Sequence, residues 1–442
     1  MLWELERMIN FPGSEEVYFW IQVGELVLLG TLLPRLQFRS HPWFIVLFCG
    51  LATIFITSAI RSTEILDRTK FALIRGVFIY ILCPSIGVLI SGKDLKRFLT
   101  IFIACWILFY DVLSVIGLYC AENGIQIIDF SQQFEINVRE DNLKLFAHPN
   151  ITSANLMLCI LMAVVGMVMS THKVVKLFYG LSIGLYLVAL SLAGGRASFV
   201  GTGVGLGIAV AAPLLKACSR KITKRIWQCC IILMVVAVTI VVTVVGLNAI
   251  TDLYNEHQSQ RISGWLSRTA SAETLQVNEQ EVSHIQKKDF LGKGLSGRER
   301  VYKAAYQLLR QQPSLLLTGT SIPLVMDMVN SIADYGLDHV HCMPLQILLE
   351  TGITGFLLML LFLVMLFIAI WRLFFDFRNA LWTRLIFLPS VGMLCVETIE
   401  CITRLDKGTQ APIPLMLFAG ITLALAFQNQ GGLYKAKYPD QK

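Results

Sequence analysis

Two neighbouring stretches of the sequence decide the fold: GRERVYKAAYQLLRQQPSLLLTGTS at residues 297–321 and HVHCMPLQILLETGITGFLL at residues 339–358. The first is basic and polar, and the second places two histidines directly before a long apolar run. A run of about twenty apolar residues is long enough to span a bilayer as a helix. Arginines and histidines therefore stand just outside the membrane where the chain enters it. This arrangement favours a membrane enzyme acting on an anionic lipid-linked substrate, with a substrate-binding transporter as the alternative.

The composition of the whole chain is that of an integral membrane protein. Of its 442 residues, 55% are hydrophobic and only 15% are charged, whereas soluble domains carry about 25% charged residues. The formal net charge of +7 does not indicate nucleic acid, because surplus Lys and Arg in polytopic membrane proteins belong to cytoplasmic loops. The expected partner is therefore the membrane and not nucleic acid.

The eleven cysteines predict neither a disulfide framework nor a metal site. Most lie inside apolar runs, where Cys behaves as a small hydrophobic residue, and no CxxC or Cys/His cluster with zinc spacing occurs. The N-terminus is acidic, and no basic segment precedes the first apolar run, which predicts no cleavable signal peptide. We expect no bound metal and no cofactor.

The apolar runs predict an all-α, polytopic integral membrane protein with about eleven transmembrane helices, ten to twelve being compatible with the pattern. The runs lie near residues 17–33, 42–60, 71–91, 98–120, 151–171, 174–194, 197–215, 226–248, 343–371, 381–400 and 411–428. The sixth and seventh are separated only by Ala193-Gly194-Gly195-Arg196. A tight glycine turn there favours two short helices over one long helix.

One large loop, residues 249–340, separates the eighth and ninth predicted helices. Its first part, through about Asp289, is polar without a sustained apolar period, which predicts irregular structure. Over residues 299–311 the apolar residues recur every three or four positions, which predicts an amphipathic helix that ends before Pro313. The chain thus divides into helices one to eight (1–248), this loop, and helices nine to eleven with a tail (341–442).

Basic residues in the short loops predict the orientation. The turn after the seventh helix has no acidic residue and five basic ones: Lys216, Arg220, Lys221, Lys224 and Arg225. Such a turn faces the cytoplasm, which places the loop 249–340 and the N-terminus outside and the C-terminus inside. The weak point is 61–70, whose basic residues then also fall outside. The predicted location is the cytoplasmic (inner) membrane, crossed many times.

Three groups of residues on the predicted outer face could carry chemistry. Arg196 stands in a glycine-rich turn, and a guanidinium offers forked donors matched to phosphate oxygens. Arg298 and Arg300 open the amphipathic helix, whose N-terminus suits an anion. His339 and His341 precede the ninth helix, and histidine readily accepts or gives a proton near neutral pH. Each group also has a structural interpretation: an interfacial arginine, a solvated helix face, a packing histidine.

Polar and ionisable residues recur in the outer halves of the predicted helices: Gln22, Glu25, Arg75, Asp111, Glu350, Glu397 and Glu400. Such groups are costly in a membrane and usually face a bundle interior or a wet cavity. Structural pairing, for example of Arg75 with Asp111, is the alternative for any single one. Their shared depth favours a polar cavity that opens outward over a pore through the membrane.

The two stretches quoted above resemble the signature region of the O-antigen ligase and polymerase superfamily. The family pattern places an aromatic four residues after an Arg, as Tyr302 follows Arg298, and then a Pro-then-Gly segment. A His leading into a Leu-rich helix with a Glu-x-Gly-x-x-Gly step completes it. The residues that fit these later parts are Pro313, Gly319, His341, Leu345, Gln346, Glu350, Gly352 and Gly355.

The resemblance extends over about residues 150–360. LAGGRASFVGTGVG, with Arg196, and HPNITSAN, with Pro149 and Asn150, are similar to two further helix starts of the family. Two positions depart from the pattern: the usual Asn after the histidine is Cys342, and the usual Trp is Tyr302. The first departure bears on acceptor recognition more than on the fold.

This resemblance implies a metal-independent glycosyltransferase that moves a glycan from undecaprenyl diphosphate to an acceptor hydroxyl. The reaction belongs to cell-surface polysaccharide assembly, and the acceptor is a glycan or lipid-linked glycan. Arginines can neutralise a diphosphate leaving group as a metal does elsewhere. The implied catalytic residues are Arg196 and Arg298 for the diphosphate and His341 for the acceptor. The implied substrate-binding residues are Arg300, His339, Glu350 and Tyr302.

Two alternatives stay open. Within the family, a polymerase would use another lipid-linked repeat unit as its acceptor, and the sequence does not separate that activity from a ligase. Outside the family, a transporter or flippase of lipid-linked sugars would be expected to show internal repeats and helices broken near mid-membrane. The sequence shows no repeat, and its polar residues lie to one side, which favours the enzyme.

Overall fold

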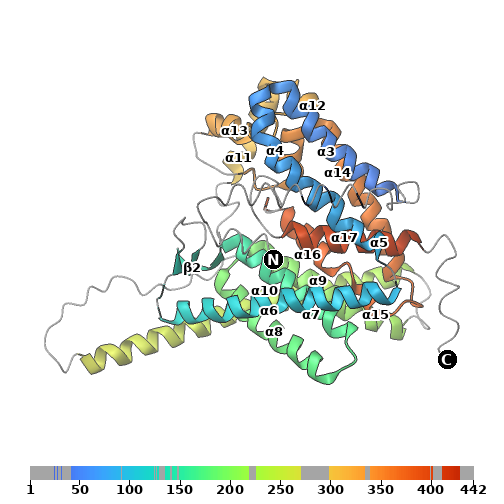
Figure 1. The fold of residues 1–442 in the computed structure, drawn as a ribbon. Coiled ribbons are helices and arrows are strands. Elements are labelled where there is room, and N and C mark those ends of the chain that lie inside the picture. The colour runs from blue at the N-terminus through green and yellow to red at the C-terminus, as the bar shows by residue number, and fades with distance from the viewer. Residues whose placement is uncertain are drawn as a thin grey trace. The chain divides into compact units, whose positions relative to one another are not determined.

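The computed structural model of the protein describes residues 24, 27, 31, 41–90, 92–123, 125, 127–128, 135–139, 142–146, 149–218, 225–269, 298–333, 339–398, 400–401 and 411–428. The chain forms two compact units (Figure 1). The first comprises residues 1–10, 101–211 and 221–292, and the second comprises residues 11–100, 212–220 and 293–442.

The predicted all-α membrane fold is confirmed. Among the described residues, eight helices are long and apolar enough to cross a membrane, and each coincides with a predicted run. Two other predicted runs differ: the last forms a shorter helix of residues 412–428, and 381–400 divides into two short helices. The run at 17–33 lies outside the described residues apart from three isolated positions, so the number eleven stays a prediction.

The first unit contains residues 101–123 of α6 (Gly92–Asn123) and the helices that follow: α7 (Pro149–Met169), α8 (Lys173–Ala193), α9 (Arg196–Cys218) as far as residue 211, and α10 (Arg225–Thr269). The predicted break between the sixth and seventh runs is confirmed. Gly194 has a φ of 67° and ends α8, and Arg196 begins α9. The N–H of Gly195 donates to Ser153 Oγ at 3.0 Å, which fixes this turn against the start of α7.

One prediction for the first unit was wrong. α10 continues to Thr269, so residues 249–269 are helical where irregular structure was expected. A helix that has already formed propagates through polar residues without needing a buried face, and no proline interrupts this stretch. The segment before α7 also forms a small antiparallel sheet, β1 (Ile127–Ile128), β2 (Glu135–Arg139) and β3 (Asn142–Phe146), in that order. Thr152 Oγ1 accepts from Leu145 N–H at 3.0 Å, which ties β3 to α7.

The membrane helices of the second unit are α3 (Pro42–Arg61), α4 (Thr63–Val77), η3 (Phe78–Leu82), α5 (Cys83–Leu89), α14 (Met343–Phe374), α15 (Leu381–Leu385), α16 (Leu388–Glu397) and α17 (Pro412–Gln428). α14 packs against α3 and α17, and α17 packs against α5. At the α5–α17 contact, a Cβ on Gly87 would lie 2.6 Å from Ile421 Cα, and one on Gly420 would lie 2.3 Å from Pro84 Cα. These two helices therefore touch backbone to backbone.

Arg61 belongs to the weak point of the predicted orientation, residues 61–70, and it bonds to another segment of the second unit. Arg61 donates to the carbonyl of Gly319 and to Thr318 Oγ1 at 3.2 Å. This basic residue therefore lies on the same side of the unit as the end of the predicted outer loop. Residues 63–70 are also helical, as the start of α4, where a loop was expected.

The predicted single span at 381–400 was wrong because Pro389 opens a separate helix, α16, after a turn at residues 386–387. Arg384 on α15 is buried, with Nε donating to Phe374 O at 2.8 Å and Nη2 donating to Ala212 O at 3.2 Å. Its guanidinium also lies over the rings of Phe374 and Phe377. This arginine thus ties α15 to α14 and to the chain after Ala212.

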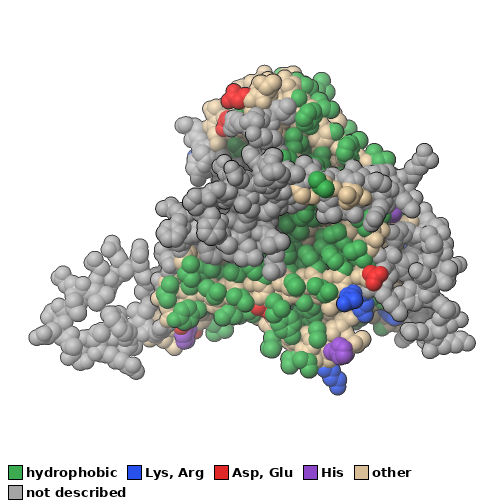
Figure 2. Space-filling view, viewed as in Figure 1, with side chains coloured by type: hydrophobic (Ala, Val, Ile, Leu, Met, Phe, Trp, Pro, Cys, Tyr) green, Lys and Arg blue, Asp and Glu red, His purple; other side chains and the backbone are tan. Residues whose placement is uncertain are grey.

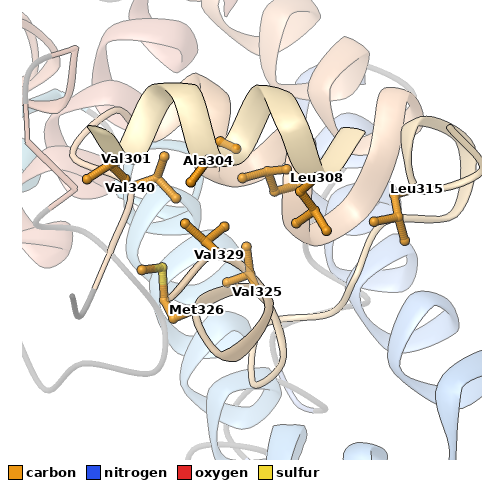
Figure 3. Packing of buried hydrophobic residues seen from close by; sticks show 10 residues of the cluster. Val301, Ala304, Leu308, Leu315, Val325, Met326, Val329 and Val340 are labelled. Atoms are coloured by element: carbon orange, nitrogen blue, oxygen red, sulfur yellow. The ribbon is translucent and has the colours of Figure 1, made fainter. Parts of the chain in front are cut away.

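The predicted amphipathic helix is confirmed as α11 (Arg298–Gln311), and two short helices follow it, α12 (Leu315–Thr318) and α13 (Val325–Ala333). Their apolar faces meet in a separate small core (Figure 3). Its buried residues are Val301, Ala304, Ala305, Leu308, Leu315, Val325, Met326, Val329, Val340 and Leu349. Because Leu349 belongs to α14, this core joins the extramembrane helices to a membrane helix.

A break in α14 makes a second connection to these helices. Gly352 has φ 68° and ψ −168°, so the helix is interrupted there. The carbonyls of Leu349 and Glu350 accept instead from the N–H groups of Thr320 at 2.7 Å and Ser321 at 2.9 Å. Gly319, also at a φ of 67°, lies against this break. The chain after α12 is therefore bonded directly to the broken turn of α14.

Large apolar side chains remain exposed along the spanning helices. Figure 2 shows hydrophobic side chains gathered over α6 and α3. On α10, Leu233, Val238 and Val242 are each about 60% exposed, at 69%, 58% and 63%. Continuous exposed apolar surface on a helix of this length is what a lipid-facing helix presents.

The glycine contact between α12 and α14 predicts a specific loss of stability. A Cβ on Gly319 would lie 2.4 Å from Glu350 O, and one on Gly352 would lie 2.6 Å from Leu317 O. Both glycines also have positive φ, which costs an L-residue about 1–2 kcal/mol before any clash. Gly319→Ala and Gly352→Ala should therefore each lower the melting temperature of the detergent-purified protein by several degrees. Gly184→Ala, with nothing within 4 Å of the new methyl group, should not; equal melting of all three would contradict this account.

Candidate functional site

One face of α11 carries two functional side chains, because residues four apart lie above one another on a helix. Arg298 forms an ion pair with Glu400 through Nη2 and Oε1. Tyr302 donates its hydroxyl to the carbonyl of His341 at 3.2 Å, and burial raises the pKa of its phenol, so it stays a donor at neutral pH. The apolar residues of the neighbouring face of α11 hold the helix on the small core. α11 is thus fixed with its arginine and tyrosine toward the residues before α14.

His341 is held in an unusual backbone conformation. Its φ is 56°, in the left-handed region that non-glycine residues rarely adopt, and such strain concentrates at functional positions. The preceding residue, Val340, is buried in the small core. The N–H of His341 donates to Nδ1 of His339 at 3.1 Å, and the two rings lie 4.1 Å apart between centroids. The hydrogen bond between the two histidines and the burial of Val340 therefore fix the segment that carries them.

Glu400 is the residue that sequence reasoning did not assign to the site. It was noted only among the ionisable residues of the predicted helices, where pairing was the alternative. Its side chain is 6% exposed, and its Oε2 lies 3.1 Å from Nδ1 of His341 while Oε1 pairs with Arg298. Three segments far apart in the chain therefore meet at one buried carboxylate. The only sequence signal for it was an acid in an apolar stretch.

These contacts fix the protons on the two histidines. A carboxylate only accepts hydrogen bonds, so Nδ1 of His341 carries a proton, and in the neutral ring the lone pair is on Nε2. Nδ1 of His339 accepts from a backbone N–H, so its neutral ring carries the proton on Nε2. His341 therefore has the tautomer of a proton acceptor at Nε2, and His339 that of a donor.

Gln346, in the first turn of α14, connects the histidine segment to the membrane interior. Its Oε1 accepts from the N–H of Val340 at 3.0 Å, and its Nε2 donates to Glu350 Oε1 at 2.6 Å. Both side chains are buried. Glu350, predicted to bind substrate, thus lies one hydrogen-bonded residue away from the histidine segment.

Besides Glu350, the predicted site residues divide into three groups. The structure brings Arg298, Tyr302, His339 and His341 together. Arg300 is exposed, and its place two residues after Arg298 directs it to another face of α11. Arg196 belongs to the first unit, where it begins α9.

An apolar groove lies beside this cluster within the second unit. Most of its wall comes from α3, α14 and α17, including Leu47, Leu358, Phe362 and Leu415. The groove is also lined by Gln346 and Cys401, which adjoin the cluster because Gln346 bonds Val340 and Cys401 follows Glu400. The lining of this mostly apolar groove therefore includes two residues that adjoin the polar cluster.

The expected absence of a bound metal stays a prediction, and the fold brings together one group of side chains beside Arg298 that could hold an ion. His339, His341 and Glu400 offer ligand atoms within 4.8 Å of one another. However, Arg298 and His341 already occupy the two oxygens of Glu400, and Nδ1 of His339 accepts a backbone N–H. A dication would also have to sit close to the positive guanidinium. The arrangement suits an anion better than a metal ion.

Comparison with known families identifies the central part of the chain. Residues 181–360 match the family model described as O-antigen ligase. This central region of the chain is therefore similar to that family. The predicted resemblance to the O-antigen ligase and polymerase superfamily of membrane glycosyltransferases is thereby confirmed. The matched region includes Arg196, Arg298 and His341 and ends before Glu400. A search of curated proteins finds no match to this chain.

Because both carboxylate oxygens of Glu400 already contact Arg298 and His341, we predict that the protein is active without a divalent metal. Glycan transfer by the purified protein should keep its rate in excess EDTA, because arginine supplies the positive charge that a metal would otherwise provide. The measurement is the initial transfer rate with EDTA, with and without added Mg²⁺ or Mn²⁺. A rate that falls in EDTA and returns with metal would instead point to His339, His341 and Glu400 as ligands.

Proposed function

We propose that the protein transfers a glycan from undecaprenyl diphosphate to an acceptor hydroxyl at the outer face of the cytoplasmic membrane. The observation that supports this most is the cluster of Arg298, Glu400 and His341 beside an apolar groove. An anion-binding side chain, a proton acceptor and an apolar surface thus lie near one another. A lipid with a charged leaving group is the donor that needs all three.

The donor end of the reaction belongs to Arg298. Its guanidinium offers paired N–H donors that match phosphate oxygens, and it opens α11, whose N-terminus carries partial positive charge. The apolar groove offers the prenyl chain a surface among α3, α14 and α17. Arg196 is a further candidate ligand of the diphosphate on the family resemblance alone. The positive charges stabilise the diphosphate as it leaves.

The acceptor end belongs to His341. The acceptor oxygen forms a bond to the anomeric carbon of the donor sugar while the bond from that carbon to the diphosphate oxygen breaks. The hydroxyl proton passes to Nε2 of His341, and undecaprenyl diphosphate leaves. Glu400 holds the Nδ1–H of His341 and stabilises the imidazolium that forms. Tyr302 and His339 position the backbone of His341 through their hydrogen bonds.

The acceptor itself distinguishes the remaining alternatives. A ligase would use a glycan or lipid-linked glycan of another kind, and a polymerase would use a second lipid-linked repeat unit. The two are separated by supplying each acceptor to the purified protein with one donor. A transporter of lipid-linked sugars would move the donor across proteoliposome membranes and transfer no glycan to either acceptor.

The assignments of Arg298 and His341 predict two different kinds of loss. Arg298→Lys keeps the charge but loses the fork, so it should impair donor binding and transfer nearly as much as Arg298→Ala. His341→Ala should lower turnover by about a hundredfold or more, the scale of a positioned proton acceptor, with donor binding almost intact. Arg310→Lys, exposed on the same helix, is the matched control for the lysine exchange. Abundance, donor binding and transfer are measured together.

If Arg298→Lys transferred glycan at the wild-type rate, the paired N–H donors of the guanidinium would not be needed for the reaction. A loss in His341→Ala that merely follows protein abundance would mean that this histidine serves packing. Either result would leave the proposed assignment of that residue untenable.

The proposed orientation, with the N-terminus outside and the C-terminus in the cytoplasm, predicts where cysteines can be labelled. Ser283, a natural choice in the predicted loop, lies outside the described residues, so Gln307, exposed on α11, is the better position. Gln307→Cys should react with a membrane-impermeant maleimide in intact cells, or in spheroplasts if an outer membrane intervenes. Lys176→Cys, exposed in the first turn of α8 next to a predicted cytoplasmic loop, should react only after permeabilisation, and the reverse pattern would invert the topology.

A further inference from the structure

Glu400 uses its two oxygens for two different partners, Arg298 and His341. Its side chain is 6% exposed, whereas those of Arg298 and His341 are 21% and 20% exposed. The acid therefore lies behind the two side chains that remain accessible. An anion arriving from the accessible side meets a guanidinium that already has a carboxylate partner.

A carboxylate and a phosphate compete for the same donors. Both accept paired hydrogen bonds from the planar guanidinium fork. A nearly buried carboxylate, however, is costly to leave without its cation. The pair between Arg298 and Glu400 should therefore open only when another anion takes the arginine and Glu400 keeps a second partner. His341 is that second partner.

We propose that Glu400 is a displaceable stand-in for the diphosphate of the donor. In the donor-free protein its carboxylate neutralises Arg298. On donor binding the diphosphate takes over the guanidinium, and Glu400 retains its hydrogen bond with His341. This inference rests on the proposed function, because it takes Arg298 as a ligand of the diphosphate.

The exchange has two consequences for the reaction. First, the negative charge of Glu400 is no longer shared with Arg298, so it is available to stabilise the imidazolium that forms when His341 takes the acceptor proton. Donor binding thus prepares the proton acceptor. Second, a single phosphodiester group would only replace one monoanion by another, whereas a diphosphate brings a second charged group. The exchange therefore selects diphosphate lipids over ordinary phospholipid headgroups, which are far more abundant in a membrane.

The chain offers a matched control on the same helix. Glu299 neighbours Arg298 in sequence, and it pairs with Lys303 at 2.6 Å. Both of these side chains are exposed, at 65% and 71%. Removing the charge of Glu299 changes the net charge near Arg298 by the same amount as removing that of Glu400. It does not free the guanidinium.

The test compares donor binding with transfer in the full-length protein, reconstituted in phosphatidylcholine nanodiscs. The probe is undecaprenyl diphosphate without sugar, titrated into wild type, Glu400→Gln and Glu299→Gln. Glu400→Gln should bind the probe about tenfold more tightly, because the competing anion is gone. Its glycan transfer should nevertheless fall about tenfold or more, because His341 loses its carboxylate. Glu299→Gln should match wild type in both measurements.

Weaker binding by folded Glu400→Gln would overturn the inference, since Glu400 would then anchor Arg298 for the donor. Should that variant not accumulate, Glu400→Asp shortens the acid and loosens the pair, and again only tighter binding agrees with the exchange. Adding phosphatidylglycerol to the nanodiscs should weaken probe binding to Glu400→Gln more than to wild type; equal weakening would refute the selectivity. If wild type itself does not bind the probe, the proposed function fails, and not merely this inference.

Discussion

The second unit depends on two backbone hydrogen bonds between the broken turn of α14 and the chain that follows α12. α14 cannot satisfy the carbonyls of Leu349 and Glu350 internally because Gly352 leaves the helical conformation. In a membrane-spanning element, unsatisfied carbonyls are expensive. The N–H groups of Thr320 and Ser321 satisfy them, so the chain after α12 is fixed to the helix that begins just after His341. Arg61 adds a third contact by donating to the carbonyl of Gly319.

The polar cluster inherits its geometry from this connection. α12 and α13 form the small core on which α11 packs, and Leu349 and Val340 contribute to the same core. Arg298 and Tyr302 on α11 are thereby held against the residues that precede α14. The left-handed conformation of His341 is maintained from several sides, by Tyr302, by His339 and by the burial of Val340. A strained residue persists where its surroundings determine its conformation in this way.

The chemistry proposed for the cluster follows from the membrane around it. A lipid-linked donor brings its prenyl chain into apolar surroundings and presents its charge at their boundary. In the proposed reaction, the groove among α3, α14 and α17 takes the prenyl chain, and Arg298, Glu400 and His341 lie beside the groove. In this proposal the guanidinium of Arg298 faces the diphosphate, and the buried carboxylate of Glu400 pairs with it while the donor is absent.

The sequence by itself determined the class of fold, the positions of eight spanning helices, the glycine break before Arg196, the amphipathic helix at 299–311 and the similarity of the central region to the O-antigen ligase family. These features are local: apolar runs, a 3.6-residue period and short motifs read on one segment at a time. Only the tertiary structure decided that Glu400 belongs with Arg298 and His341, that Gln346 links Val340 to Glu350, and that Arg300 is directed elsewhere. It also decided the extension of α10 and the division of residues 381–400. The physical reason is that an acid in an apolar stretch indicates a need for a partner but does not indicate which residue is the partner. For Glu400 that partner is Arg298, 102 positions away. Such a pairing is fixed by how the helices pack, which no single segment encodes.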